Sequence, residues 1–206
     1  MKKRGPEKYE DLLDVATDLF LAAGYRQVSI AKLLEKAGGS RETVYRHFKN
    51  KEDLFAAVID RQIKEYLDSM TAIEVDDEDL RQGLLDLSEA TVRVVTSERY
   101  VQLRRVVIGE SSTRPEIGEL YFERTFRAAS KGWDSFLSRQ QELGHLKDIP
   151  PATLAEYIVG MLLYRLSLQR LLNVKKAPTP KQIRTLCTRV VDDFLAGFAT
   201  APGPAA

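Results

Sequence analysis

The sequence predicts an all-α protein with a small N-terminal helical domain and a larger C-terminal helical domain. Apolar residues recur every three or four positions along almost the whole chain, and no segment alternates in the way that indicates a strand. Glycine, proline and capping residues separate the helical runs. With 206 residues, of which 44% are hydrophobic, the chain can bury one large core or two small ones.

The first predicted helix spans residues 6–23. Pro6 suits the first turn of a helix, where its missing N–H is not needed, and Gly24 suits the left-handed residue just past the end. Apolar residues from Tyr9 to Ala23 fall on one face at three- and four-residue steps. This face is expected to pack against the helices that follow.

Two short helices are predicted next, over residues 29–37 and 41–48. Ser29 can cap the first and Ser40 the second, and Gly38-Gly39 breaks the chain between them. Neither helix is long enough to be stable alone in water. Two short helices joined by a glycine-containing turn form a candidate helix-turn-helix motif, which the first helix and a longer fourth helix would hold in place.

The fourth helix is predicted to open at the capping pair Asn50 and Asp53 and to carry an apolar stripe as far as Met70. An acidic run follows it. Beyond this run, the periodicity predicts helical segments at residues 79–96, 97–108, 115–142, 151–173 and 180–198. The tail at residues 201–206 is expected to be disordered.

The net charge of +1 hides an uneven distribution of charge. Residues 1–51 contain eleven Lys and Arg against seven Asp and Glu, whereas residues 52–89 contain three basic and twelve acidic residues. A basic segment followed by an acidic one suggests that only the first faces a polyanion. Charge alone leaves open the alternative that both segments are solvated surfaces.

Composition argues against several classes of protein. No run of eighteen apolar residues predicts a membrane span, and no apolar stretch follows the basic start as in a secretory signal. Cys187 is the only cysteine, which excludes an internal disulfide and fits a reducing cytoplasm, so we expect a cytoplasmic protein.

The segment from Leu12 to Ile63 resembles the DNA-binding domain of the TetR family of transcriptional regulators. Two positions depart from the family pattern: Gly39 replaces a branched apolar residue, and Glu42 replaces a small residue or proline. The matching positions are Ala16, Leu19-Phe20, Gly24-Tyr25, Ser29-Ile30, Ala37-Gly38, Ser40, Thr43-Val44-Tyr45, His47-Phe48, Lys51 and Leu54-Phe55.

The resemblance implies a three-helix helix-turn-helix domain at residues 1–52 that binds double-stranded DNA. It implies phosphate contacts for Thr43, Tyr45 and Lys51, and base or phosphate contacts for Arg41 and His47. The full set of expected DNA-binding residues is Ser29, Ser40, Arg41, Glu42, Thr43, Tyr45, Arg46, His47 and Lys51. Two alternatives remain: Tyr45 at the edge of the core, and Glu42 as a partner of the helix dipole, which we favour over contact with a cytosine amino group.

The resemblance also implies a ligand-binding and dimerisation domain at residues 53–200, loosely similar to AcrR/AefR-like members of the family. The segment 151–173 is apolar nearly all round, so it needs a partner on more than one face. With residues 180–198 it can form a four-helix interface between two copies; the alternative is a central helix buried in a monomer. The expected interface residues are Leu154, Ile158, Met161, Leu162, Arg165, Leu186, Val190 and Phe194.

An effector pocket is predicted among the helices of the C-terminal domain, because aromatic residues recur there at helical spacing near several arginines. For each aromatic residue, ordinary core packing is the competing interpretation. The expected pocket residues are Arg104, Phe122, Phe126, Trp133, Tyr164 and Leu168.

No catalytic motif stands out, so we expect neither an enzyme nor a cofactor or metal site. The two histidines, His47 and His145, lie far apart in sequence, and Cys187 falls in an apolar stripe. The sequence therefore predicts a homodimeric, ligand-responsive repressor that a small-molecule effector releases from a palindromic operator. The alternative is a nucleoid-associated or adaptor protein of the same fold without ligand-controlled operator binding.

Overall fold

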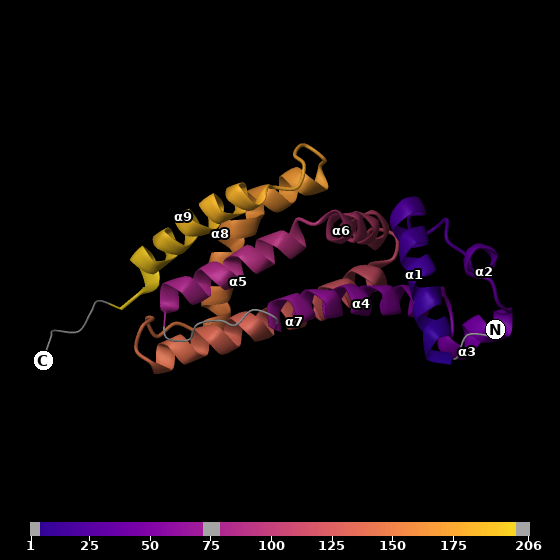
Figure 1. Ribbon diagram of the computed structural model, residues 1–206, viewed down its shortest axis with the longest axis horizontal. Helices are drawn as coiled ribbons and strands as arrows, with labels where there is room; N and C mark the ends of the chain where they lie inside the picture. Colours follow the sequence, from indigo (N-terminus) through magenta and orange to yellow (C-terminus); the bar gives the residue numbers. More distant parts are fainter. Residues whose placement is uncertain (1–4, 72–78, 201–206) are drawn as a thin grey trace, which may run out of the picture. The chain divides into compact units, whose positions relative to one another are not determined.

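A computed structural model of the chain describes residues 5–71 and 79–200 (Figure 1). Side chains at 5–7, 66, 67, 69–71 and 126–131 are outside the description. The helices are α1 (Gly5–Ala23), α2 (Ile30–Ala37), α3 (Arg41–His47), α4 (Lys51–Thr71), α5 (Leu80–Val95), α6 (Glu98–Ser111), α7 (Pro115–Glu142), α8 (Pro151–Leu171) and α9 (Pro180–Phe198).

The all-α prediction is confirmed, and each predicted helix is present with ends close to those expected. The side chain of Met70, most of the acidic run before α5 and the tail at 201–206 lie outside the described residues. Within them, no helix is both long and apolar enough to cross a membrane.

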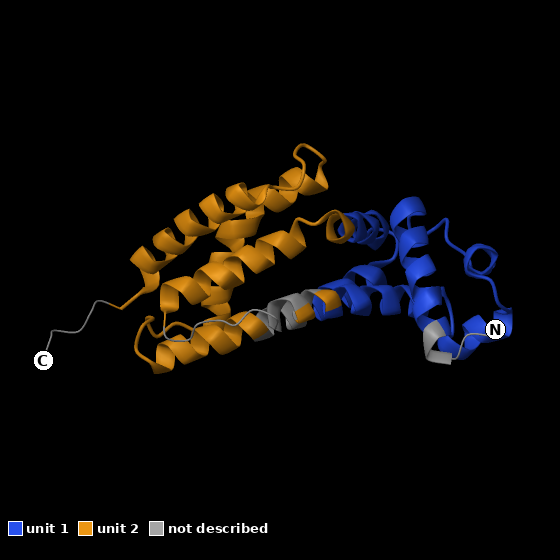
Figure 2. Ribbon diagram, in the orientation of Figure 1, with its two compact units in different colours: residues 1–64, 102–125 blue, residues 65–101, 126–206 orange. Residues whose placement is uncertain are grey.

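The chain divides into two compact units (Figure 2). Unit 1 comprises residues 1–64 and 102–125, and unit 2 comprises residues 65–101 and 126–206. This division differs from the predicted boundary after residue 52. Residues 102–125 join unit 1 by tertiary packing, which the order of residues along the chain does not reveal. Unit 1 therefore holds, besides α1 to α3, most of α4, much of α6 and the start of α7.

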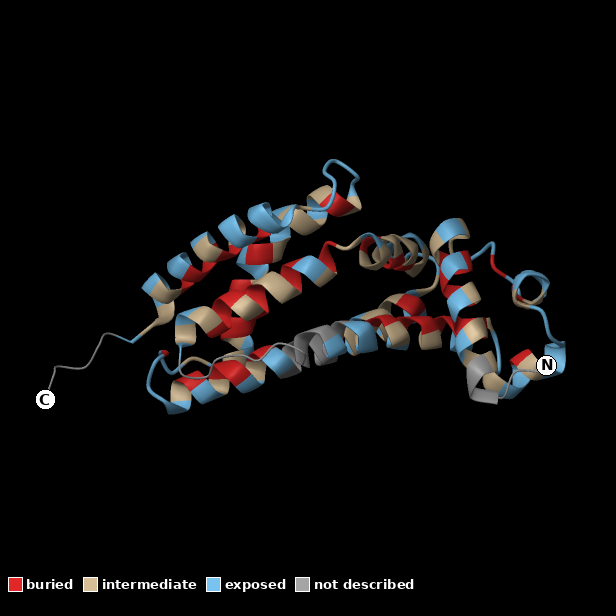
Figure 3. Cartoon of the chain, viewed as in Figure 1, coloured by how far each residue is buried: buried red, intermediate tan, exposed pale blue. Residues whose placement is uncertain are grey.

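The core of unit 1 is built around three aromatic rings. Phe20 of α1 lies 5.8 Å from Tyr25 and 4.8 Å from Phe55 of α4, measured between ring centroids. The geometries are stacked for the first pair and edge-to-face for the second, which aromatic pairs prefer. Buried residues of α6 and α7, including Leu103 and Ile117, belong to the same core. Figure 3 colours the buried residues of the chain red. The core that includes the helix-turn-helix thus also contains residues of helices far away in sequence.

The turn between α2 and α3 relies on two glycines with positive φ, 65° at Gly38 and 103° at Gly39. The Gly38 N–H closes α2 by bonding to the carbonyl of Leu34 at 2.8 Å. Lys8 of α1 crosses the turn and donates to the carbonyl of Ala37 at 2.7 Å. A Cβ on Gly39 would lie 3.3 Å from the Lys8 side chain. Glycine at 39, the departure from the family pattern, therefore suits both the backbone and the approach of Lys8.

The core of unit 2 is formed mainly by α5, α8 and α9 packing together, with residues of α7. Trp133 of α7 is buried, and its indole N–H donates to the Thr91 hydroxyl of α5 at 3.2 Å. Arg170 of α8 is also buried and donates to the Thr96 carbonyl and to the Glu98 carboxylate at 3.1 and 2.7 Å. These bonds satisfy a charge that would be costly to bury alone.

Candidate nucleic-acid interface

Helix α3 has one side in the core and a polar side in solvent. Val44 and its C-cap residue Phe48 are buried in the core of unit 1. The exposed residues of this helix are Arg41, Glu42, Tyr45 and Arg46. All four carry hydrogen-bonding groups of the kinds that contact phosphates and base edges. Tyr45 is 54% exposed, so its ring is not part of the core, contrary to the alternative interpretation.

Ser29 and Ser40 are the N-cap residues of α2 and α3, as predicted. Ser29 Oγ accepts the backbone N–H of Lys32, and Ser40 Oγ accepts that of Thr43, each at 3.2 Å. The hydroxyls of Ser40 and Thr43 also lie 3.0 Å apart. The predicted capping pair of α4 is present too, because Asn50 Oδ1 accepts from the Asp53 N–H at 2.7 Å. These caps fix where each helix of the motif begins.

Glu42 and Arg46 form an exposed ion pair along α3, with 3.2 Å between Arg46 Nη2 and Glu42 Oε1. They are four residues apart, the spacing at which helix side chains meet. Glu42 also lies in the first turn, where a carboxylate suits the helix dipole. The carboxylate therefore shields part of the positive charge that Arg46 would offer to DNA.

His47 is half-buried against α1. Its ring lies edge-on to Tyr9 with 5.6 Å between centroids, and Tyr9 in turn stacks on Phe48 at 5.3 Å. These contacts fix the orientation of the imidazole, leaving part of the side chain exposed at the end of α3.

Lys51 is the first residue of α4 and is half-buried. Its Nζ lies 4.2 Å from the centroid of the Tyr25 ring and donates to the carbonyl of Arg26 at 3.3 Å. Desolvation and the neighbouring positive charge of Arg114 lower the pKa of Lys51. An ammonium has three N–H donors. The bond to Arg26 therefore leaves donors for a DNA phosphate.

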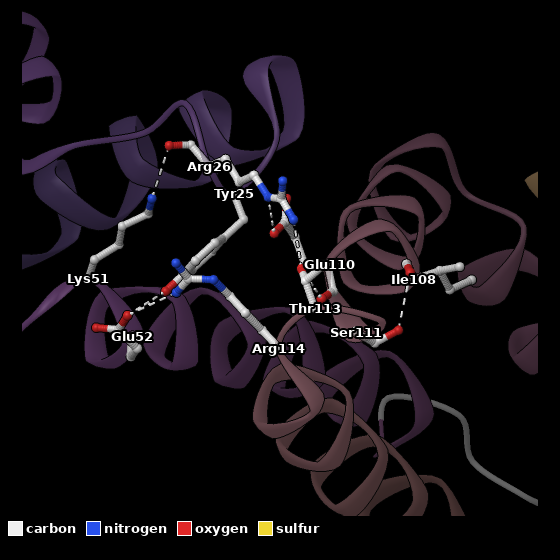
Figure 4. A network of polar contacts seen from close by, with 9 residues as sticks. All are labelled: Tyr25, Arg26, Lys51, Glu52, Ile108, Glu110, Ser111, Thr113 and Arg114. Carbon is white, nitrogen blue, oxygen red and sulfur yellow. Dashed lines mark hydrogen bonds and ion pairs between the residues drawn. The ribbon is translucent and has the colours of Figure 1, made fainter.

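Sequence reasoning missed a polar network that surrounds Lys51 (Figure 4). The Tyr25 hydroxyl donates to Glu52 Oε1 at 2.9 Å, and Arg114 Nη1 contacts the same oxygen at 3.4 Å. Burial and the bond to Glu52 raise the pKa of Tyr25. The bond to its own backbone N–H, followed by that from Tyr25, lowers the pKa of Glu52. The guanidinium carbon of Arg114 lies 5.1 Å from the centroid of the Tyr25 ring.

The same network holds Arg26, which follows α1 in the turn toward α2. Arg26 Nε donates to Glu110 Oε2 at 3.1 Å, and Nη2 donates to the Thr113 hydroxyl at 2.7 Å. These partners lie 84 and 87 residues from Arg26 in the sequence. No local motif signals such pairs, so only the three-dimensional structure reveals them.

The predicted pocket residues do not share one environment. Arg104 is half-buried in unit 1, and Phe122 in the same unit is 64% exposed. In unit 2, Trp133 is closed into the core, whereas Tyr164 is 79% exposed and Leu168 is exposed as well. The side chain of Phe126 lies outside the described residues. Phe122, Tyr164 and Leu168 face solvent and line no enclosed space within their own units, contrary to the expectation for pocket residues, whereas a pocket lined by Arg104 and Trp133 stays a prediction.

The predicted dimer interface also needs correction. The structure buries five of its residues within the subunit, so they have almost no surface left for a partner: Leu154, Ile158, Leu162, Val190 and Phe194. Leu186 is half-buried against the same core, and Met161 and Arg165 are exposed. Hydrophobic residues that do face solvent recur along α8 at Tyr157, Met161, Tyr164 and Leu168, with Leu172 just after it. This second face was not separated from the first by the sequence.

Cys187 and His145, two residues of types that often serve in catalysis, have contacts within the fold. Cys187 is buried, and burial raises the pKa of its thiol to about 12. His145 Nδ1 lies 2.7 Å from Gln140 Oε1. Among the described residues, no group of three or more His, Cys, Asp or Glu side chains is placed to hold a metal ion.

Comparisons with known families match both parts of the chain. Residues 12–58 match the family of bacterial regulatory proteins of the tetR type. Residues 82–200 match the C-terminal domain of AefR-like transcriptional repressors.

Individual relatives agree with the family matches. The transcriptional repressor ComR of Escherichia coli K12 is 30% identical over 156 residues, which cover 73% of each chain. A TetR-family regulator structure from Mesorhizobium loti superposes with a TM-score of 0.85 and 25% identity, covering 97% of this chain and all of that one. The flavonoid-responsive regulator FrrA gives a TM-score of 0.82 at 22% identity, covering 96% of this chain and 100% of that one. The chain belongs to the TetR family of helix-turn-helix transcriptional regulators.

Proposed function

We propose that the chain represses transcription by binding a palindromic operator as a homodimer, with α3 of each subunit in the major groove. The observation that carries the proposal is the division of α3 into a buried side and a polar side. Val44 and Phe48 anchor the helix, while Arg41 and Tyr45 extend into solvent. A rigidly packed helix with exposed donors is what direct reading of base edges requires.

Within this interface, the residues have different proposed roles. Arg41 reads base edges, since it is exposed in the first turn of α3. Tyr45, Thr43 and Lys51 contact phosphates, and His47 completes the surface at the end of the helix. The two capping serines hold the helix starts and offer hydroxyls to the DNA backbone, while Arg46 becomes available when phosphate competes with Glu42 for its guanidinium.

The homodimer is proposed to form through the exposed apolar face of α8, made of Tyr157, Met161, Tyr164 and Leu168. Monomeric proteins rarely expose a continuous apolar patch of this kind, and the copy of α8 in a second subunit offers the same residues about a two-fold axis. Arg165, at the edge of this face, would lie at the rim of the interface. Two recognition helices then meet two half-sites of one operator.

Control by a small-molecule effector is the finer part of the proposal. FrrA, which shares the fold, is described as flavonoid-responsive. At 22% identity this supports effector control in general and does not identify the effector of this chain. A coupling of about 1–3 kcal/mol between effector and operator binding, which is typical of allosteric proteins, would weaken DNA binding several-fold to a hundredfold.

The test is a selection from a pool of random duplexes by the purified wild-type chain. A regulator is expected to enrich one palindromic sequence and to bind it at least about a thousandfold more tightly than unrelated DNA at physiological salt. Equal binding to all sequences, lost together as salt rises, would support the nucleoid-associated alternative and contradict operator recognition.

A further inference from the structure

The helix-turn-helix unit includes a segment that lies outside the matched DNA-binding domain. The α6–α7 corner, residues 110–114, contacts the turn after α1 and the start of α4 within unit 1 (Figure 4). We propose that this corner, chiefly through Arg114, positions the Lys51 ammonium for its contact with a DNA phosphate. The inference rests on the proposed role of Lys51 in DNA binding.

The first connection passes through Tyr25. Lys51 Nζ and the Arg114 guanidinium both lie over the Tyr25 ring, at 4.2 and 5.1 Å from its centroid. The ring face is negative, so it attracts both cations. The Tyr25 hydroxyl and Arg114 share one oxygen of Glu52, which ties the ring to the first turn of α4. Removing Arg114 would therefore take one contact from the Tyr25 ring and one from the Glu52 carboxylate at the same time.

The second connection passes through Arg26. Its carbonyl is the acceptor for Lys51 Nζ, and its side chain is held by Glu110 and Thr113 at the corner. The Glu110 side chain is only 12% exposed, so its charge is less screened by water than at a fully solvated site. The backbone atom that orients Lys51 therefore belongs to a residue that the corner fixes.

The charges around Lys51 favour its contact with a phosphate. Arg114 lies close enough to Lys51 to help lower the pKa of its ammonium, so the two positive charges repel in the free chain. A phosphate that approaches Lys51 relieves this repulsion. Glu52 already neutralises part of the Arg114 charge, which leaves Lys51 as the residue whose remaining N–H donors contact DNA. Arg114 is accordingly a positioning residue that acts through Lys51.

The test is a double-mutant cycle on the full-length protein with Lys51→Ala, Arg114→Gln and the double variant. The probe is the duplex that the wild-type chain enriches from a random pool; if no duplex is enriched, the proposed function fails and not this inference. Arg124→Gln is the matched control, because Arg124 lies on α7 in the same unit and pairs with Asp60 of α4. It removes the same charge at another site.

Lys51→Ala is expected to reduce the salt slope of binding by about one, which is the loss of one phosphate contact. Arg114→Gln is expected to weaken binding about fivefold and to reduce the same slope, while Arg124→Gln leaves both unchanged. The double variant is expected to bind no more weakly than Lys51→Ala alone. If the two losses multiply, or if Arg114→Gln leaves the slope unchanged, Arg114 does not act through Lys51 and the inference is wrong.

Thr113→Val tests the second connection in a variant that keeps every charge. It removes one bond to Arg26 and is expected to weaken binding about twofold in the wild-type background and not at all in the Lys51→Ala background. Equal weakening in both backgrounds would contradict the route through Arg26.

Discussion

The outward faces of α3 and α8 differ in chemistry although both helices are anchored in the same way. Each presents buried apolar residues to its own unit, such as Val44 on α3 and Ile158 on α8. Outward, α3 carries charged and hydroxyl groups, whereas α8 carries tyrosine, methionine and leucine. The inner faces thus explain the fold, and the chemistry of the outer faces supports the proposed partners, a polyanion for α3 and a second copy of the chain for α8.

The largest effect is expected when the outward face of α8 is made polar. Tyr164→Asp with Leu168→Asp places two carboxylates on the proposed interface, where desolvating them is costly. We expect a monomer by light scattering and operator affinity reduced at least about a hundredfold, because the second half-site no longer contributes. Ile108→Asp, on an exposed residue of α6, is the control and should stay dimeric. A double variant that remains dimeric would show that α8 is not the interface.

The next largest effect is expected at Arg41. If its guanidinium reads a base, Arg41→Ala should lower discrimination at particular base pairs by about 1–3 kcal/mol and leave the dimer intact. Binding to a set of single-base operator variants measures this. Uniform weakening over all variants would instead assign Arg41 to a phosphate.

A smaller effect is expected at Tyr45, the proposed contact to the DNA backbone. Tyr45→Ala is expected to weaken binding about tenfold on every sequence, since a hydrogen bond to a charged phosphate is lost. Tyr45→Phe keeps the ring and removes only the hydroxyl, so it separates the contribution of the hydroxyl to binding from that of the ring. If Tyr45→Phe binds as the wild type does, the hydroxyl makes no phosphate contact.

The smallest effect is expected at Glu42. The pair with Arg46 is exposed on both sides, so Glu42→Gln should change the free energy of unfolding by less than about 0.5 kcal/mol. Removing the carboxylate leaves Arg46 fully available, and affinity for any duplex should rise several-fold at low salt. Weaker binding would mean that Glu42 itself accepts a bond from a base, the interpretation that we did not favour.

The sequence predicted those features that depend on residues only a few positions apart in the chain. Ser29, Ser40 and Asn50 signalled helix starts because capping depends on residues only a few positions away, and Gly24 signalled the left-handed residue that follows α1. These features were confirmed because each depends on interactions within a single turn or helix. Periodicity also predicted Val44, Tyr45 and Phe48 on the inner side of α3; this is confirmed for Val44 and Phe48 and wrong for Tyr45, which is exposed.

The sequence did not predict what tertiary packing decides. On α8, apolar residues surround the helix, so periodicity could not separate inner Leu154 from outer Tyr164, and most of the predicted interface proved to be core. The contacts of Arg26 with Glu110 and Thr113 connect residues without a shared motif. Phe122 and Trp133 belong to the same series of aromatic residues at helical spacing on α7. Phe122 is exposed and Trp133 is buried, a difference that only the packing of α7 determines.

We propose that α8 joins two copies of the chain so that two α3 helices read one operator. The most direct measurement is the mass of the complex with the selected palindromic duplex, determined by sedimentation with and without DNA. We expect two chains in the free protein and two chains per duplex, with protection of two half-sites on one face of the DNA. A monomer in solution that binds one chain per duplex would contradict it.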